Sequence, residues 1–411
     1  MKRLLLAGLV AATGFAHALQ PPNVPGLLPA EIVRPLLAQD PRVVAARSGL
    51  EVARQESGLL DQSPYEWTGK AQGQHRSLDD GTRFGEWNIG IERTIRLAGK
   101  GAADRNLGKA TIEESEARYG QALHESAREL ASLWVDWLGA ERGNGLAAEN
   151  LQAVQQNLAA VDKRNRAGDA SKLDRNLAAA ELAEQKRMDN DARTQAAVAW
   201  ARLSARFPGI GRQNMLLPSP MLIAEGEVLW RDRIIAESEA LKVAQTQMRM
   251  AQAQAERARA EKVPDPTMGV YTASEAGGRE RILGIAISIP LPGGLRDLRS
   301  AKAVAAVEVA RNAVDLKKRE LETEVAAALA TARGSYQSLQ MASDAALAMQ
   351  ENAKLVQRAY TLGEGDLQTL LVARRQAIAA ANNALQAQVG ALKAYLGLLV
   401  DAHFIWGLEH D

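Results

Sequence analysis

The sequence has 411 residues, a formal net charge of +1 and no cysteine. The balanced charge gives no electrostatic argument for a nucleic-acid partner, and the missing cysteine excludes disulfides, thiolate metal sites and a cysteine nucleophile. Only 4% of the residues are aromatic, a composition that favours long, closely packed helices over a broad globular core.

The N-terminus has the pattern of a secretory signal peptide. Lys2 and Arg3 precede an apolar stretch from Leu4 to Phe15, and Ala16-His17-Ala18 is a small-residue cleavage site. The apolar stretch is too short to cross a bilayer as a helix. We therefore expect residues 1–18 to be removed on export.

The rest of the sequence repeats itself with an offset of about 195 residues. We expect one repeat over residues 19–230 and a second over residues 231–411. Each has the order helix, two short strands, a very long helix, a glycine-containing break and another helix. The corresponding landmarks are Ile89-Gly90-Ile91 with Ile285-Ala286-Ile287, Gly139 with Gly334, and Gly168-Asp169 with Gly363-Glu364.

The first repeat contains two expected strands, over residues 65–76 and 86–96. Apolar or small side chains alternate with polar ones, so that each strand has one apolar face. Trp67 lies on this face in the first strand, and Trp87, Ile89 and Ile91 lie on it in the second. Arg93 is an exception on the same face.

The second repeat contains expected strands over residues 267–274 and 281–291. Ile285, Ile287 and Ile289 share the apolar face of the latter strand. The expected strands average about ten residues, the length that crosses a bilayer as a tilted strand. We expect these faces to contact lipid, with Trp67, Trp87 and Tyr271 as candidates for an aromatic girdle.

A soluble sheet packed on a helix is the alternative interpretation of one such hairpin. Two hairpins flanked by very long helices leave no obvious soluble sheet to complete. Four strands cannot close a barrel alone, so strands that lie in lipid need other copies of the chain at their edges.

Two very long helices are expected, over residues 101–166 and 295–360. The first segment has no proline and spans on the order of 100 Å as a helix. Apolar residues recur at coiled-coil spacing in both repeats. The seams are Leu151, Val154, Leu158 and Val161 in the first repeat, and Ile378, Leu385, Leu392 and Leu399 in the second.

These residues resemble the TolC family of outer-membrane efflux channels over nearly the whole chain after residue 18. The segments that carry the resemblance are Ile289-Pro290-Leu291-Pro292-Gly293-Gly294, residues 360–367, and their first-repeat counterparts at residues 94–100 and 166–171. Leu97-Ala98-Gly99-Lys100, with the short chain and the absence of cysteine, is most similar to the cobalt–zinc–cadmium branch of the family.

The resemblance implies a mainly α fold with a small β part. Three chains with four strands each would close a twelve-stranded barrel, and long helical hairpins would form an α-helical tunnel across the periplasm. Partners implied in the same way are a homotrimer, a periplasmic membrane-fusion adaptor, an inner-membrane pump of the RND type and outer-membrane lipid.

The resemblance also assigns the hairpin ends. The adaptor-docking tips would be Arg166, Gly168, Asp169, Leu362, Gly363 and Glu364. Asp174 and Tyr360 match two positions of the family's entrance latch, and Asp366 is a further gate candidate. Gly365, Thr369 and Val372 stand where the best-known drug-efflux member has an arginine and two aspartates, so a gate here must use different charges.

Other chemistry finds little support in the sequence. There is no G-x-S-x-G elbow and no P-loop, so we expect no enzyme and no cofactor. His75, His124, His403 and His410 form no metal-binding pair on a helix, and we expect no stably bound metal.

The expected function is the outer-membrane component of a tripartite efflux system that exports heavy-metal cations. Type I protein secretion and drug efflux are alternative cargo assignments, because the sequence of a pore does not reveal its cargo. A periplasmic coiled-coil scaffold is the alternative of another class.

Overall fold

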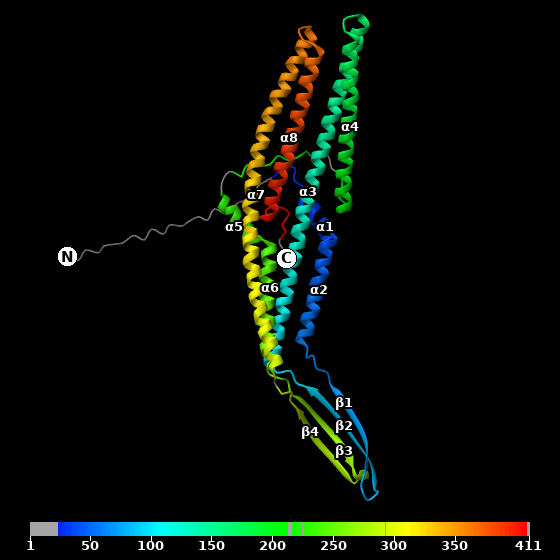
Figure 1. The fold of residues 1–411 in the computed structure, drawn as a ribbon, viewed down its shortest axis with the longest axis vertical. Coiled ribbons are helices and arrows are strands. Elements are labelled where there is room, and N and C mark those ends of the chain that lie inside the picture. The colour runs from blue at the N-terminus through cyan, green and yellow to red at the C-terminus, as the bar shows by residue number, and fades with distance from the viewer. Residues whose placement is uncertain (1–23, 213–215, 224–225, 292, 409–411) are drawn as a thin grey trace, which may run out of the picture.

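The structure is a computed structural model that describes residues 24–212, 216–223, 226–291 and 293–408. The expected signal peptide, residues 1–18, lies outside these residues, as do Pro292 and His410. The described chain is a long rod with a sheet at one end and two helical hairpin tips at the other (Figure 1). In this part of the chain, no helix is both long enough and apolar enough to cross a membrane.

The first repeat begins with two short helices and continues into a strand hairpin and a helical hairpin. Its elements are α1 (Ala30–Ala38), α2 (Pro41–Asp61), β1 (Thr68–Ser77), β2 (Arg83–Thr94), α3 (Ala98–Ala167) and α4 (Lys172–Arg206). The 70 residues of α3 extend over about 100 Å, because an α-helix rises about 1.5 Å per residue.

The second repeat has the same order of elements. They are α5 (Glu227–Glu237), α6 (Glu239–Ala260), β3 (Thr267–Glu275), a short 3₁₀ turn η1 (Ala276–Gly278), β4 (Glu280–Ser288), α7 (Gly294–Leu362) and α8 (Leu367–Asp401). The expected fold class, mainly helical with a small sheet, is confirmed.

The four strands form one antiparallel sheet in the order β1-β2-β3-β4. The two hairpins therefore lie side by side, and β2 of the first repeat pairs with β3 of the second from Trp87↔Ser274 to Thr94↔Thr267. Within the described chain, β1 and β4 each have a strand neighbour on one side only. Unpaired strand edges of this kind invite pairing with another chain.

The expected strand ends differ most from the structure at the starts of β1 and β2 and at the end of β4. Tyr65 and Trp67 precede β1, where the Tyr65 hydroxyl is hydrogen bonded to Asp265 at 2.8 Å instead of following the pleat. Ile289 follows β4, whose last residue pairs with Thr267. The next residue on the β3 side is Pro266, which has no N–H to extend the ladder, and Pro290 follows Ile289 on the β4 side.

The long helices pack through the expected seams. Val154 and Val161 in α3, and Leu385, Leu392 and Leu399 in α8, are all buried. The other expected seam residues, Leu151, Leu158 and Ile378, are only half-buried, so the pattern is borne out in part. Because each helix buries only a narrow stripe, most of its surface stays exposed in the single chain.

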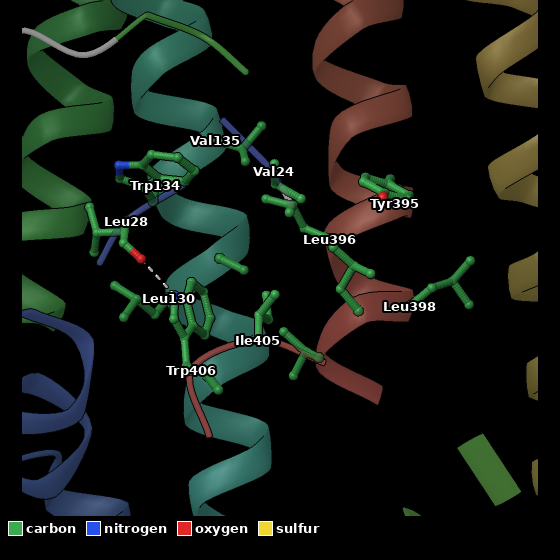
Figure 2. Close-up of a cluster of buried hydrophobic side chains, with 14 of the residues drawn as sticks. Val24, Leu28, Leu130, Trp134, Val135, Tyr395, Leu396, Leu398, Ile405 and Trp406 are labelled. Carbon is green, nitrogen blue, oxygen red and sulfur yellow. Dashed lines mark hydrogen bonds between the residues drawn. The ribbon is translucent and has the colours of Figure 1, made fainter. Parts of the chain in front are cut away.

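A hydrophobic core lies midway along the rod, where the N-terminal segment and the C-terminus meet α3 and α8. Trp134, Leu130 and Leu396 are almost wholly buried there. The Trp406 indole donates a hydrogen bond of 2.8 Å to the Leu28 carbonyl (Figure 2). Trp134 therefore serves in packing.

A buried ionic network ties α2 to α3 and α4 beside this core. Asp40 accepts hydrogen bonds from the Arg42 backbone N–H at 2.9 Å, from Arg206 at 2.6 Å and from the Ser126 hydroxyl. Burial alone would raise the pKa of Asp40, but these hydrogen bonds hold the pKa below the ordinary aspartate range. Arg206 also pairs with Glu129 at 3.0 Å.

Candidate functional site

One face of the sheet consists of exposed, large apolar side chains. The register places Ile91 opposite Val270 and Val270 opposite Ile285, so the expected apolar faces of β2 and β4 form one surface. Its large members in β2 and β4 are Trp87, Ile89, Ile91, Leu283, Ile285 and Ile287, each at least 46% exposed. Such a contiguous patch is unusual on a soluble monomer and marks a contact with lipid or protein.

The opposite face of the sheet is polar and carries cross-strand ion pairs. Lys70 contacts Glu92 at 2.6 Å, and Arg76 contacts Glu86 at 3.2 Å. Gln74 donates a hydrogen bond of 2.7 Å to Glu86. A sheet with one apolar and one polar face suits a boundary between lipid and water.

Tyr271 lies on the polar face, which corrects its assignment to an aromatic girdle. It pairs with Gly90 on one side and Gly284 on the other, and both neighbours belong to the face opposite Ile89 and Ile285. A Cβ atom at Gly284 would stand 2.5 Å from the Tyr271 ring. The two glycines make room for the ring, a pairing that single-strand periodicity does not show.

Trp67 and Arg93 lie together at the end of the sheet next to the helices. The Arg93 guanidinium sits 5.6 Å from the Trp67 ring centroid and its Nε donates to the Tyr65 carbonyl at 3.1 Å. The charged exception on the apolar face is thereby paired. Trp67 is 66% exposed, so its place in a girdle stays a prediction.

A charged cluster joins the sheet to the helices. Lys100 contacts Asp265 at 3.0 Å, and Asp265 also accepts hydrogen bonds from the Tyr65 hydroxyl and the Leu97 backbone N–H. Burial, followed by the hydrogen bond to Asp265, raises the pKa of Tyr65 to about 12. The sequence analysis missed this cluster, although Lys100 belongs to the segment that carried the branch resemblance.

The two hairpin tips have the same backbone geometry. Gly168 and Gly363 have φ angles of 87° and 80°, and each ends a long helix in the left-handed conformation. The following N–H groups, of Asp169 and Glu364, donate back to helix carbonyls at 2.8 and 2.9 Å. Glycine adopts this conformation without the steric cost of a Cβ atom.

Six exposed residues form the surface of the tips, which we call the tip patch: Arg166, Gly168, Asp169, Leu362, Gly363 and Glu364. Leu362 is 65% exposed, and the side chains of Asp169 and Glu364 make no ion pair within the described chain. Their role in docking stays a prediction.

The carboxylates of two expected gate residues are occupied within their own hairpins. Asp174 forms a capping box with Ser171 at the start of α4. Asp366 caps α8, where it accepts hydrogen bonds of 2.8 Å from both the backbone N–H and the hydroxyl of Thr369. These bonds hold the pKa of Asp366 low. Neither carboxylate contacts the neighbouring hairpin in the described chain.

Other residues connect the two hairpins near the tips. The Arg164 guanidinium of α3 lies 5.1 Å from the Tyr360 ring centroid of α7. Arg375 of α8 contacts Glu181 of α4 at 2.8 Å. An apolar cluster of Val161, Ala178, Leu367, Leu370 and Leu371 lies beside them. We call these contacts the inter-hairpin pin; of its polar members, the sequence analysis named only Tyr360.

The charged partners of the pin are unequally exposed. The Glu181 side chain is 3% exposed and the Arg375 side chain is 60% exposed. Next to them, burial lowers the pKa of Arg374. The Arg374 guanidinium donates to Gln357 of α7 while its second terminal nitrogen has no hydrogen-bond partner in the described chain.

Two of the histidines meet in space. His75 is an exposed residue of β1, whereas the rings of His124 and His403 have centroids 5.6 Å apart. Among the described residues, no group of three or more histidine or carboxylate side chains is placed to hold a metal ion. The pair was not expected, because 279 positions of sequence separate the two residues and neither lies in a motif.

The comparisons with known proteins agree with this geometry. Residues 230–399 match the family model described as "Outer membrane efflux protein". No curated protein matches the sequence. Among solved structures, CusC has a TM-score of 0.74 at 18% identity, with 90% of this chain and 92% of that chain covered.

Two further channels are similar at low identity. The CmeC outer membrane channel of Campylobacter jejuni has a TM-score of 0.74 at 14% identity, covering 93% of this chain and 86% of that one. The MtrE outer membrane channel of Neisseria gonorrhoeae in its open state has a TM-score of 0.72 at 20% identity, covering 93% and 90%. At this identity, these structures establish the fold.

The chain has the fold of these outer-membrane channels, and its residues 230–399, about two fifths of the sequence, match the outer membrane efflux protein family. It is a channel component and not an enzyme. It is located in the outer membrane, with its helical tunnel in the periplasm.

Proposed function

We propose that three copies of the chain form one continuous conduit. The observation that carries the proposal is the four-stranded sheet, which is apolar on one face, polar on the other and open at β1 and β4. Pairing β1 of one copy with β4 of the next closes both edges in a twelve-stranded barrel. The hairpins of α3, α4, α7 and α8 then surround the tunnel.

Fractionation and gel migration test the assembly. The expected result is an outer-membrane protein that migrates as a trimer without heating and as a monomer after boiling. A monomer in the periplasmic extract would support the soluble scaffold instead and would refute the conduit.

We infer that the tip patch receives a periplasmic adaptor, which in turn connects the conduit to an inner-membrane pump of the RND type. The patch offers an exposed leucine, Leu362, beside the unpaired carboxylates of Asp169 and Glu364. The tight reversals at Gly168 and Gly363 present these groups at the end of the rod.

Replacing Gly363 tests the docking. Gly363→Val places a branched side chain at a φ of 80°, which distorts the turn while leaving the sheet and core intact. We expect trimers to form normally, whereas resistance and crosslinking to the adaptor are lost. Gly145→Val, in the middle of α3, is the matched control for adding a valine to a long helix. Normal resistance in the Gly363 variant would count against docking at the tip.

We propose heavy-metal cations as the cargo. The polar face of the sheet carries four glutamates, Glu86, Glu92, Glu275 and Glu280, against Lys70 and Arg76. In the closed barrel this excess of carboxylates would line the lumen and favour cations. The resemblance of residues 97–100 to the cobalt–zinc–cadmium branch supports the same assignment.

Two measurements distinguish the cargo assignments. Trimers in planar bilayers under a salt gradient should show a reversal potential of cation-selective sign. A strain that lacks the channel should become sensitive to zinc, cobalt or cadmium while its sensitivity to antibiotics stays unchanged. The opposite pattern of sensitivity would indicate drug efflux, and loss of a secreted protein would indicate type I secretion.

A further inference from the structure

The C-terminal end of α8 brings an unusual pair of imidazoles together against α3. The His403 side chain is 3% exposed and the His124 side chain is 17% exposed. Their ring centroids are 5.6 Å apart, with the ring planes tilted by 36°. His403 lies two residues beyond the end of α8 and has a φ of 55°, a left-handed conformation that few residues other than glycine adopt.

Each ring has one nitrogen beside a carboxylate and one without a partner. His124 Nε2 lies 3.1 Å from Asp401, and His403 Nδ1 lies 3.8 Å from Glu237. The remaining nitrogens, His124 Nδ1 and His403 Nε2, are buried and make no hydrogen bond within the described chain. An unsatisfied buried polar atom is costly and requires an explanation, and here two such atoms belong to neighbouring rings.

The arrangement matches the way proteins prepare histidines for metals. A metal-binding histidine usually donates its other N–H to a carboxylate, which fixes the tautomer and leaves a lone pair for the ion. Asp401 is placed to do this for His124, whereas Glu237 lies 3.8 Å from His403 Nδ1, beyond hydrogen-bond distance. Metal–nitrogen bonds of about 2.0–2.1 Å place the centroids of two ligating rings roughly 5 to 6.5 Å apart, depending on the bond angle. The observed separation of 5.6 Å falls in this range.

The charged groups around the two rings balance, with three carboxylates paired to three cations. Asp401 is also contacted by Arg128, and Glu237 by Arg233 and Lys242. Glu239 is buried and pairs with Lys242. His124 and Asp401 line a cavity of about 510 Å³ between α3, α5, α6, α7 and α8, which reaches the His124 side of the pair.

Against the sequence-based expectation of no stably bound metal, we propose that His124 and His403 form a site for a first-row transition-metal ion of the copper or zinc type, bound through His124 Nδ1 and His403 Nε2. Two protein ligands leave further coordination positions to water, so the ion exchanges more readily than in a four-ligand structural site. Imidazole ligands select copper and zinc over magnesium and calcium. The bound ion would tie the end of α8 to α3 and so strengthen the middle of the rod.

Metal binding to the purified trimer tests the site. The full mature chain, without a histidine tag, is titrated with Cu²⁺ and separately with Zn²⁺, and bound metal is counted by elemental analysis after desalting. We expect one ion per protomer, with Cu²⁺ bound more tightly than Zn²⁺ and no competition from Mg²⁺. His124→Gln and His403→Gln should each weaken binding more than tenfold, while His75→Gln on β1 leaves it unchanged.

A second measurement uses the unaltered protein. The electron paramagnetic resonance spectrum of the Cu²⁺ complex should show hyperfine coupling to two imidazole nitrogens, and bound metal should raise the unfolding temperature of the wild type only. No stoichiometric ion, coupling to a single nitrogen, or full affinity in both glutamine variants would overturn the proposal. Because these readouts do not involve transport, failure of the site and failure of the conduit remain distinguishable.

Discussion

A side chain at Gly139 is expected to weaken the packing of α3 against α8. A Cβ atom built at this position would lie less than 3.0 Å from Cγ2 of Val389, a contact that real Cβ atoms do not show. At Gly145, six residues further along α3, an added Cβ meets nothing within 4 Å. Both positions lie inside the same helix, so the gain in helix propensity from glycine to alanine is the same for each.

The difference between the two alanine variants therefore isolates the overpacking. Gly145→Ala should stabilise the protein by about 0.5–1 kcal/mol, the usual gain at a helix-interior glycine. Gly139→Ala should be less stable than Gly145→Ala by about 1–3 kcal/mol, the usual cost of an extra methyl group in a filled interface. Val389→Ala removes the obstructing methyl and should relieve most of the loss in the double variant.

Guanidinium unfolding followed by circular dichroism, with one common slope for all variants, measures these differences. A coupling energy between positions 139 and 389 of about 1 kcal/mol or more is expected, because the residues are in direct contact. Equal midpoints for Gly139→Ala and Gly145→Ala, or no coupling with Val389→Ala, would refute the reasoning.

Two further predictions concern charged pairs. Arg375→Ala leaves the buried Glu181 without its partner, and because Arg375 itself is largely exposed we expect the inter-hairpin pin to weaken by only about 1 kcal/mol. With the pin taken as a restraint on the periplasmic entrance, single-channel recordings should then show a roughly fivefold larger open population, and an unchanged conductance record would exclude the Arg375–Glu181 pair as such a restraint. The lowered pKa of Asp40 means that its stabilising contribution is present above the unfolded aspartate pKa and is lost as pH falls through the lower folded value. The wild-type protein should therefore unfold at a lower temperature below about pH 4. The Asp40→Asn variant should be less stable than the wild type at pH 7 and should lose less of its stability in acid. A variant that loses as much stability in acid as the wild type would contradict this.

Local features of the chain could be predicted from the sequence because they depend on neighbouring residues. The alternation in β2 and β4, the seams of α3 and α8 and the turns at Gly168 and Gly363 each follow from side-chain period or backbone freedom. The strand ends were less accurate. The β3–β4 ladder ends where Pro266, just before β3, has no N–H to offer, and the side-chain period within β4 carries no information about its neighbouring strand.

The repeat gave the order of elements but not the environment of each residue. Gly139 and Gly334 occupy corresponding positions, yet only Gly139 faces a side chain that excludes a Cβ atom. Tyr271 has an aromatic side chain suited to a membrane interface, but its register places it against Gly90 and Gly284 on the polar face.

The sequence by itself determined that this protein has two copies of a strand hairpin and a long helical hairpin, because period and glycine position are properties of short stretches of chain. Only the tertiary structure decided which charged side chains are already bound to a partner within the chain. It commits Asp174 and Asp366 to helix caps, and it pairs Glu181 with Arg375 across two hairpins. It also brings His124 beside His403. These contacts join residues from separate elements, and their distances are set by how the helices pack.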